Sequence, residues 1–154
     1  MPLSRDDAWT LFCQWTLDYE RYPDLETGHP RAALVELERL GFPDEVVRAV
    51  ASHADRLDVP RESRLERALY AVDELTGFIA AVAYVRPEGI RGMTPKSVRK
   101  KLKQPSFAAA VDREELRRGA EDLGVDFDEH VAFVIAALED RADELGLAGS
   151  GAAA

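Results

Sequence analysis

Apolar residues recur along most of the chain at intervals of three and four positions, the spacing that places side chains on one face of a helix. Segment 63–86 shows this pattern most strongly, and Phe78 and Val82 extend its apolar surface well around the cylinder. Its main stripe, at about 100° per residue, consists of Leu65, Leu69, Val72, Thr76, Ile79 and Ala83. A helix that is apolar on most sides is typical of the centre of a bundle, so we expect this one to be buried.

Helix start signals recur, whereas strand signals are nearly absent. Capping-box spacing occurs three times, because a residue that can cap is followed three positions later by glutamate. The pairs are Ser63 with Glu66, Asp112 with Glu115, and Asp126 with Glu129. Together with the glycine and proline positions, these signals predict helices near 4–15, 30–40, 43–54, 63–86, 95–103, 112–123 and 126–145, and a loop over 17–29. The sequence therefore predicts an all-α fold.

Composition limits the class of protein. The chain has 154 residues, 46% of them hydrophobic and 32% charged, which is typical of a globular protein and predicts a single domain over 1–147. Residues 148–154 contain only Gly, Ala and Ser and are predicted to be a disordered tail. The net charge of -9 argues against binding to nucleic acid or to an anionic membrane. No apolar run reaches the roughly 20 residues that span a bilayer, and no signal peptide is seen, so a cytoplasmic location is expected.

Asp73 is the first residue that could carry chemistry. It follows Leu69 by four positions, at the margin of the apolar stripe. Because burying a lone carboxylate is costly, its side chain should be paired, hydrogen-bonded or bound to a metal. Its neighbour Glu74 points almost the opposite way and has the pattern of a solvated charge. From periodicity alone, Asp73 can also be interpreted as a hydrogen-bonded acid in the core or as the partner of an arginine.

The three histidines differ in context. His29 precedes a predicted helix start, His53 closes the 43–54 helix, and His130 lies among apolar residues. A histidine near a helix C-terminus is stabilised by the helix dipole without binding a ligand, so each histidine has a structural interpretation. Two imidazoles and a carboxylate that converge on one point would suit zinc, iron or manganese. Spacing alone cannot bring these residues together, because they lie on different helices.

A basic run stands out against the acidic background. It has two interpretations, a solvated helix face or a clamp for phosphate or an acidic partner. The run consists of Lys96, Arg99, Lys100, Lys101 and Lys103. The single cysteine, Cys13, lies between Phe12 and Trp15 and is interpreted as a buried structural thiol.

Several segments together resemble a bacterial branch of the HD superfamily of metal-dependent phosphohydrolases. The similarity covers roughly residues 18–145 and is most specific in the second half. The segments are Asp18-Tyr19-Glu20-Arg21-Tyr22-Pro23-Asp24, His29-Pro30, Ser52-His53-Ala54-Asp55, Pro60–Glu66, Ala71-Val72-Asp73-Glu74-Leu75-Thr76-Gly77, Lys96–Lys101 and Arg117–Glu121.

The resemblance implies a helical bundle and a dispersed set of metal ligands. Asp73 resembles the late aspartate of that set, and His29 and His53 resemble its two further histidines. The implied cofactor is a divalent metal ion such as zinc, manganese, iron or magnesium. The implied substrate is a phosphate ester or a nucleotide, and the implied partner is thus a phosphate-containing small molecule.

The chain departs from the family pattern at one place. Trp15-Thr16 occupy the position of the signature His-Asp pair, and the helix that carries the early histidine is missing. The missing aspartate normally bridges two metals, so we expect at most one metal per chain and activity that is lost or reduced. Loss of about two core helices should also expose apolar surface. The alternative function is therefore a non-catalytic module for self-association or protein interaction.

Overall fold

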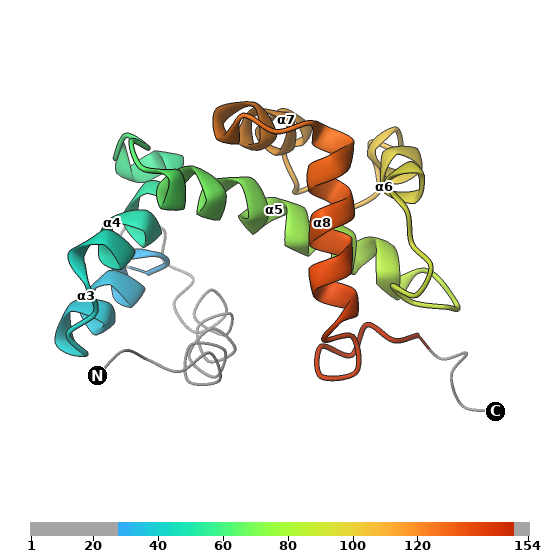
Figure 1. The fold of residues 1–154 in the computed structure, drawn as a ribbon, viewed down its shortest axis with the longest axis horizontal. Coiled ribbons are helices and arrows are strands. Elements are labelled where there is room, and N and C mark those ends of the chain that lie inside the picture. The colour runs from blue at the N-terminus through green and yellow to red at the C-terminus, as the bar shows by residue number, and fades with distance from the viewer. Residues whose placement is uncertain (1–27, 150–154) are drawn as a thin grey trace. The chain divides into compact units, whose positions relative to one another are not determined.

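The computed structural model describes residues 28–149. Within this range the chain is helical and contains no β-strand, which confirms the all-α prediction (Figure 1). The predicted helix at 4–15, with Cys13, lies outside the described residues, as do most of the predicted 17–29 loop and residues 150–154 of the predicted tail. The elements are α3 (Arg31–Arg39), α4 (Asp44–Ser52), the 3-10 helix η1 (Asp55–Leu57), α5 (Arg64–Tyr84), α6 (Pro95–Leu102), α7 (Arg113–Leu123) and α8 (Phe127–Glu139).

The chain divides into two compact units, Met1–Glu66 and Arg67–Ala154. In the first unit, α3 and α4 contact each other and η1 contacts α4. Helix α3 buries Ala33 and Leu37, while α4 buries Ala49 and Ser52. The described part of the first unit thus contains a small helical hairpin of α3 and α4. One domain over 1–147 stays a prediction.

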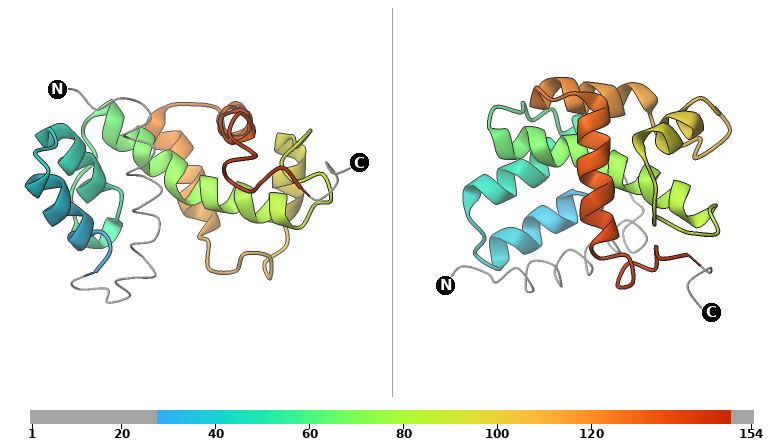
Figure 2. Two further views of the ribbon diagram at one scale, coloured as in Figure 1. Left: turned by 90° about the horizontal axis from the view of Figure 1, so that it is seen from below. Right: turned by 45° about the vertical axis from the view of Figure 1, so that its right-hand side comes forward.

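The second unit contains the main hydrophobic core. Helix α8 runs across α5, and it contacts both α6 and α7 (Figures 1 and 2). No helix among the described residues is both long enough and apolar enough to cross a membrane. Side chains of all four helices and of the segments after α5 and α8 form the core: Leu75, Phe78, Ile79, Val82, Ala83, Ile90, Met93, Val98, Leu116, Val131, Val134, Ile135, Ala142 and Leu147.

The buried face of α5 differs in phase from the predicted stripe. Leu75 and Phe78 are fully buried, whereas Leu65, placed on the stripe from the sequence, is 47% exposed. The close approach of α7 explains the shift, because Gly119 of α7 lies directly over Ala71: a Cβ added to Gly119 would lie 2.8 Å from the Ala71 Cα. The prediction of a buried helix holds, and its buried face is set by this contact.

The predicted capping positions begin their helices. At the start of α5, the backbone N–H of Glu66 donates to Ser63 Oγ at 3.2 Å, and Ser63 N–H donates back to Glu66 Oε2 at 2.9 Å. Asp112 accepts from two backbone N–H groups at the start of α7, and Asp126 does the same at α8. These bonds satisfy backbone donors that a helix end leaves without a partner.

The last predicted helix ends earlier than expected. Helix α8 ends at Glu139, and the chain continues through turns in which several hydrogen bonds tighten to three-residue spacing, as from Ala142 N–H to the Glu139 carbonyl at 3.1 Å. These turns bury Leu147, which is 3% exposed, and its carbonyl accepts a hydrogen bond from Ile90 N–H at 2.8 Å. The helical period ends because the chain must turn to place Leu147 in the core.

Candidate functional site

His29 and His53 lie side by side in the first unit. Their Nε2 atoms are 3.2 Å apart, and the two rings meet edge to face with centroids 5.2 Å apart. His53 is the C-cap of α4 and is 8% exposed, whereas His29 lies just before α3 and is half-buried. The structure therefore brings together two of the three residues predicted as metal ligands.

The ring of His53 is oriented by its own helix. Its Nδ1 lies 2.5 Å from the carbonyl oxygen of Val50, one of the last carbonyls of α4. Such a carbonyl has no partner within the helix, so the Nδ1–H group donates to it. The proton on Nδ1 leaves Nε2 with a lone pair that faces His29. In many proteins a metal-binding histidine is oriented in this way: the ring nitrogen that does not bind the metal donates its N–H to a backbone carbonyl.

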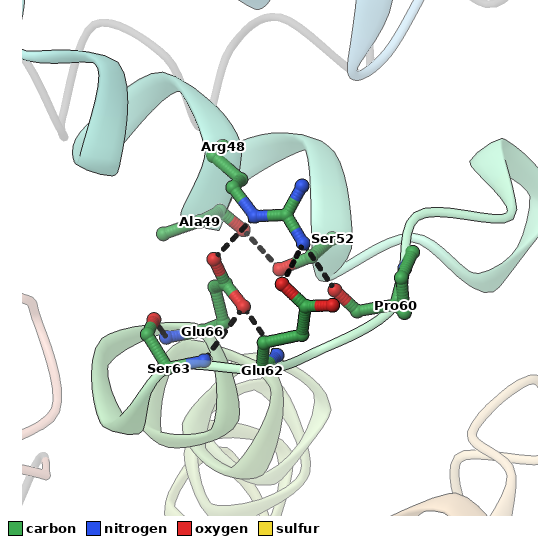
Figure 3. A network of polar contacts seen from close by, with 7 residues as sticks. All are labelled: Arg48, Ala49, Ser52, Pro60, Glu62, Ser63 and Glu66. Atoms are coloured by element: carbon green, nitrogen blue, oxygen red, sulfur yellow. Dashed lines mark hydrogen bonds and ion pairs between the residues drawn. The ribbon is translucent and has the colours of Figure 1, made fainter.

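A polar network holds the segment after η1 against α4 (Figure 3). Arg48 of α4 donates to Glu66 at 2.9 Å, to Glu62 at 3.0 Å and to the carbonyl of Pro60 at 3.0 Å. A guanidinium has five N–H donors in a planar fork, which allows one side chain to tie three acceptors. The network fixes the path by which the chain leaves η1 and enters α5.

Arg61 holds the same segment close to the histidine pair. It donates to the carbonyl of Ser52, the residue before His53, at 2.9 Å and pairs with Asp55 at 2.7 Å. The positioning role of Arg48 and Arg61 was not predictable from the sequence, because the chain has sixteen arginines and neither of these two has a distinctive spacing.

Glu66 is charged in this network although its side chain is buried. The pKa of Glu66 is lowered, first by the hydrogen bond from the Ser63 backbone, with further contributions from the Glu62 backbone and from Arg48. Burial opposes this change by raising the pKa. The hydrogen bonds prevail, because donors that point at a carboxylate favour its ionised form.

The geometry of the pair fits two ligands of a metal ion. Two imidazole nitrogens held by one tetrahedral metal at about 2.0–2.1 Å lie about 3.3 Å apart. The Nε2 atoms of His29 and His53 are 3.2 Å apart. Across residues 28–149, no group of three His, Cys, Asp or Glu side chains lies close enough to hold a metal. The separation of the two Nε2 atoms thus fits two ligands of one metal ion, and it equally fits a direct N–H···N hydrogen bond.

Asp73 lies in the second unit, on an exposed part of α5. From the sequence, a metal or another partner was expected because burying the charge of Asp73 would be costly. That reason does not apply, because the side chain is exposed. Glu74 is the residue that is half-buried, so its interpretation as a solvated charge is wrong. The pKa of Glu74 is raised, mainly by burial and then by the charges of Asp73, Glu115 and Asp112. The role of Asp73 as a third ligand stays a prediction.

His130 has a structural role. It is 5% exposed, and its Nε2 lies 3.0 Å from the carbonyl oxygen of Ala71, across the contact between α8 and α5. A buried ring nitrogen with a backbone partner needs no ligand to explain it. This contact agrees with the structural interpretation made from the sequence.

The basic run lies on and just after α6. Lys101 is partly buried, with Nζ 4.6 Å from the centre of the Phe107 ring, a cation–π contact. Arg99 pairs with Asp128 of α8 at 2.5 Å. The other three members, Lys96, Lys100 and Lys103, are exposed, and none forms an ion pair with a carboxylate of the described chain.

The lysines of the chain are confined to this place. All four occur between Lys96 and Lys103, and every other basic residue is an arginine. Most described arginines pair with a carboxylate or a backbone carbonyl, as Arg39 does with Glu36 at 2.5 Å. The run is therefore a local concentration of positive charge on an acidic protein.

Comparison with known proteins gives no match. No protein-family model fits the chain, and neither a curated protein nor a solved structure is significantly similar to it.

Proposed function

We propose that the protein binds one divalent metal ion per chain through His29 and His53, as a reduced relative of the HD superfamily of phosphohydrolases. The observation that carries this proposal is the 3.2 Å separation of the two Nε2 atoms. These two histidines are the pair that the sequence resemblance marks as ligands, although they are 24 positions apart in the chain. Asp73 is proposed as the third ligand on the resemblance alone.

The donor set suits a transition metal better than magnesium. Imidazole nitrogen is a common ligand for zinc and iron, whereas magnesium and manganese prefer oxygen ligands. When bound, such a metal supplies a Lewis acid that polarises a phosphoryl oxygen. The chain lacks the His-Asp pair of the family that it resembles. We therefore expect weak metal binding and little or no hydrolysis of phosphate esters.

Metal binding tests the proposal directly. Metal-free protein is titrated with zinc, manganese or cobalt by calorimetry, and the cobalt complex is examined by absorption spectroscopy. We expect at most one site per chain, and His29→Ala and His53→Ala should each weaken binding by about 10- to 100-fold or more, since loss of a ligand costs at least as much as loss of a residue that orients one. Asp73→Ala should also weaken binding, whereas Glu74→Ala should not.

The third histidine provides a matched control. His130→Gln keeps a donor for the Ala71 carbonyl and removes an imidazole from elsewhere in the chain, so metal affinity should not change. His29 is half-buried, which makes His29→Ala the variant that best preserves the fold. If His29→Ala binds metal as tightly as the unaltered protein, the histidine pair is a structural hydrogen bond and the proposal is wrong.

A non-catalytic module for self-association is the second candidate. Phe133 of α8 is 70% exposed, and Tyr84 and Val85 at the end of α5 are 69% and 55% exposed. Exposed aromatic side chains of this size are typical of surfaces that contact another protein. This function does not need metal, so the metal titration separates the two candidates.

A further inference from the structure

A pocket of about 480 Å³ opens within the second unit, between the end of α6, the second half of α7 and the start of α8. Leu102, Val125 and Phe127 are among the residues that line it and give it an apolar surface. Its volume lies in the range of about 300–1,000 Å³ that is typical of sites for small molecules. The pocket is therefore large enough to receive the body of a small organic ligand.

Three cationic side chains also line this pocket: Arg99 and Lys103 from the α6 region and Arg117 from α7. Lys103 is exposed and has no carboxylate partner among residues 28–149. It is the member of the basic run that both faces the pocket and keeps its charge uncompensated. The sequence placed Lys103 and Arg99 in a basic run, but it did not connect them with Arg117, which lies on another helix.

The two arginines remain able to bind an anion although each has an ion pair. Arg99 pairs with Asp128, with side chains 56% and 44% exposed, and Arg117 pairs with Glu114, with side chains 52% and 80% exposed. Exposed pairs of this kind contribute little to stability. A guanidinium has five N–H donors, so one carboxylate leaves several for a ligand.

We propose that this pocket binds a nucleoside monophosphate, with the phosphate at Lys103, Arg99 and Arg117 and the base against the apolar surface. An apolar surface beside clustered cations favours a ligand with a planar body and one compact anionic group. Two carboxylates, Glu121 and Asp126, also line the pocket. Asp126 Oδ1 accepts the capping hydrogen bonds at the start of α8, whereas Glu121 can accept hydrogen bonds from an amino or hydroxyl group of the ligand. The choice of phosphate over carboxylate rests on the proposed function, whose substrate class is the phosphate ester.

The test measures binding to metal-free protein in the presence of EDTA. Adenosine monophosphate, adenosine and inorganic phosphate are titrated in turn, with calorimetry as the measurement. The monophosphate should bind at least about tenfold more tightly than either fragment, because only the whole ligand uses both the cations and the apolar surface. Lys103→Glu should weaken its binding by about tenfold or more.

Lys96→Glu is the matched control, because it makes the same charge reversal on the same basic run at a residue that does not line the pocket. It should change the affinity by less than about twofold at physiological salt, where charges beyond about 8 Å are screened. Val125→Glu adds a carboxylate to the apolar surface at a residue already 37% exposed, and it should also abolish binding without unfolding the protein.

Four outcomes would overturn the proposal. Equal losses in Lys103→Glu and Lys96→Glu would indicate a diffuse basic surface, as would tighter binding of RNA than of the monophosphate. Equal affinity for inorganic phosphate would exclude a role for the apolar surface, and no binding at millimolar concentration would exclude the site. His29→Ala should leave binding in EDTA unchanged, so failure of this proposal and failure of the metal proposal are seen separately.

Discussion

Gly119 shows how one absent side chain allows two helices to approach. A Cβ at this position would lie 2.8 Å from the Cα of Ala71, which is a backbone atom that cannot move without shifting α5. Gly119 and Ala71 are both buried, and the contact fixes which face of α5 is turned toward α7. The glycine thus contributes to packing in a way that its intrinsic preference for helix would not indicate.

We expect Gly119→Ala to destabilise the protein by about 1–3 kcal/mol, as overpacking of a well-packed contact does. Gly77→Ala is the control, since Gly77 lies in the interior of α5 with nothing within 4 Å of the added Cβ. Because alanine favours helix over glycine, that change should stabilise the protein by about 0.5–1 kcal/mol. Urea denaturation measures both free energies of unfolding, and equal stabilisation by the two substitutions would contradict the close contact.

At the scale of the element, the start of α5 depends on the charge of Glu66. Its folded pKa is lowered below the ordinary value of 4.5, so folding favours the carboxylate. The stability that results is fully present above the unfolded pKa and is lost as the pH falls through the lower folded pKa. Glu66→Gln should therefore destabilise the protein at pH 7, and the difference from the unaltered protein should shrink below about pH 4.5.

Glu62→Gln is the matched control for this prediction. Glu62 also pairs with Arg48, but its side chain is 73% exposed and solvent weakens the pair. Its effect at pH 7 should be much smaller than that of Glu66→Gln. Thermal unfolding followed by circular dichroism between pH 3 and 7 gives both curves, and a difference at Glu66 that does not depend on pH would show that the charge has no role.

The elements themselves were largely predictable from the sequence, because their signals are local. The expected caps are present at the starts of α5, α7 and α8, where they are formed by Ser63 with Glu66, by Asp112 and by Asp126. They were predictable because a capping residue and its partners lie within four positions. The buried face of α5 and the end of α8 were not predictable. Both depend on distant contacts, of Gly119 with Ala71 and of Leu147 with the core, that no local pattern contains.

In the candidate sites, too, local features were predictable from the sequence and contacts between distant residues were not. Resemblance marked His29 and His53, but only the fold brings their Nε2 atoms together over a separation of 24 positions. The basic run was visible in the sequence, whereas the pocket beside it needs Arg117 and Phe127 from two other elements. Asp73 was expected to be buried because it lies beside the apolar stripe, but its side chain is exposed. Burial depends on the neighbouring helices, which the local pattern does not contain.

At the scale of the whole molecule, exposed apolar side chains predict self-association. Phe133 is 70% exposed on α8. Phe133→Glu should weaken any dimer by at least about tenfold, because a buried aromatic anchor commonly contributes this much to an interface. The stability of the isolated chain should change by less than about 0.5 kcal/mol, as is usual for an exposed position.

Sedimentation velocity over a range of concentrations measures this effect. Val35→Glu serves as the control, since Val35 of α3 is 68% exposed but is not aromatic and lies in the first unit. A strict monomer at high micromolar concentration would contradict self-association, and an equal effect of both substitutions would contradict the assignment to Phe133.

The confinement of all four lysines to residues 96–103 gives the protein an unusual chemical signature. A reagent that acylates primary amines has targets only in this short stretch and at the chain's α-amino group. Fluorophores or cross-linkers attached to these lysines would report on α6 and the residue after it without any engineered cysteine. Because Lys103 lines the pocket and Lys96 does not, the ratio of their acylation rates is an internal measure of how well a bound molecule shields that one amine.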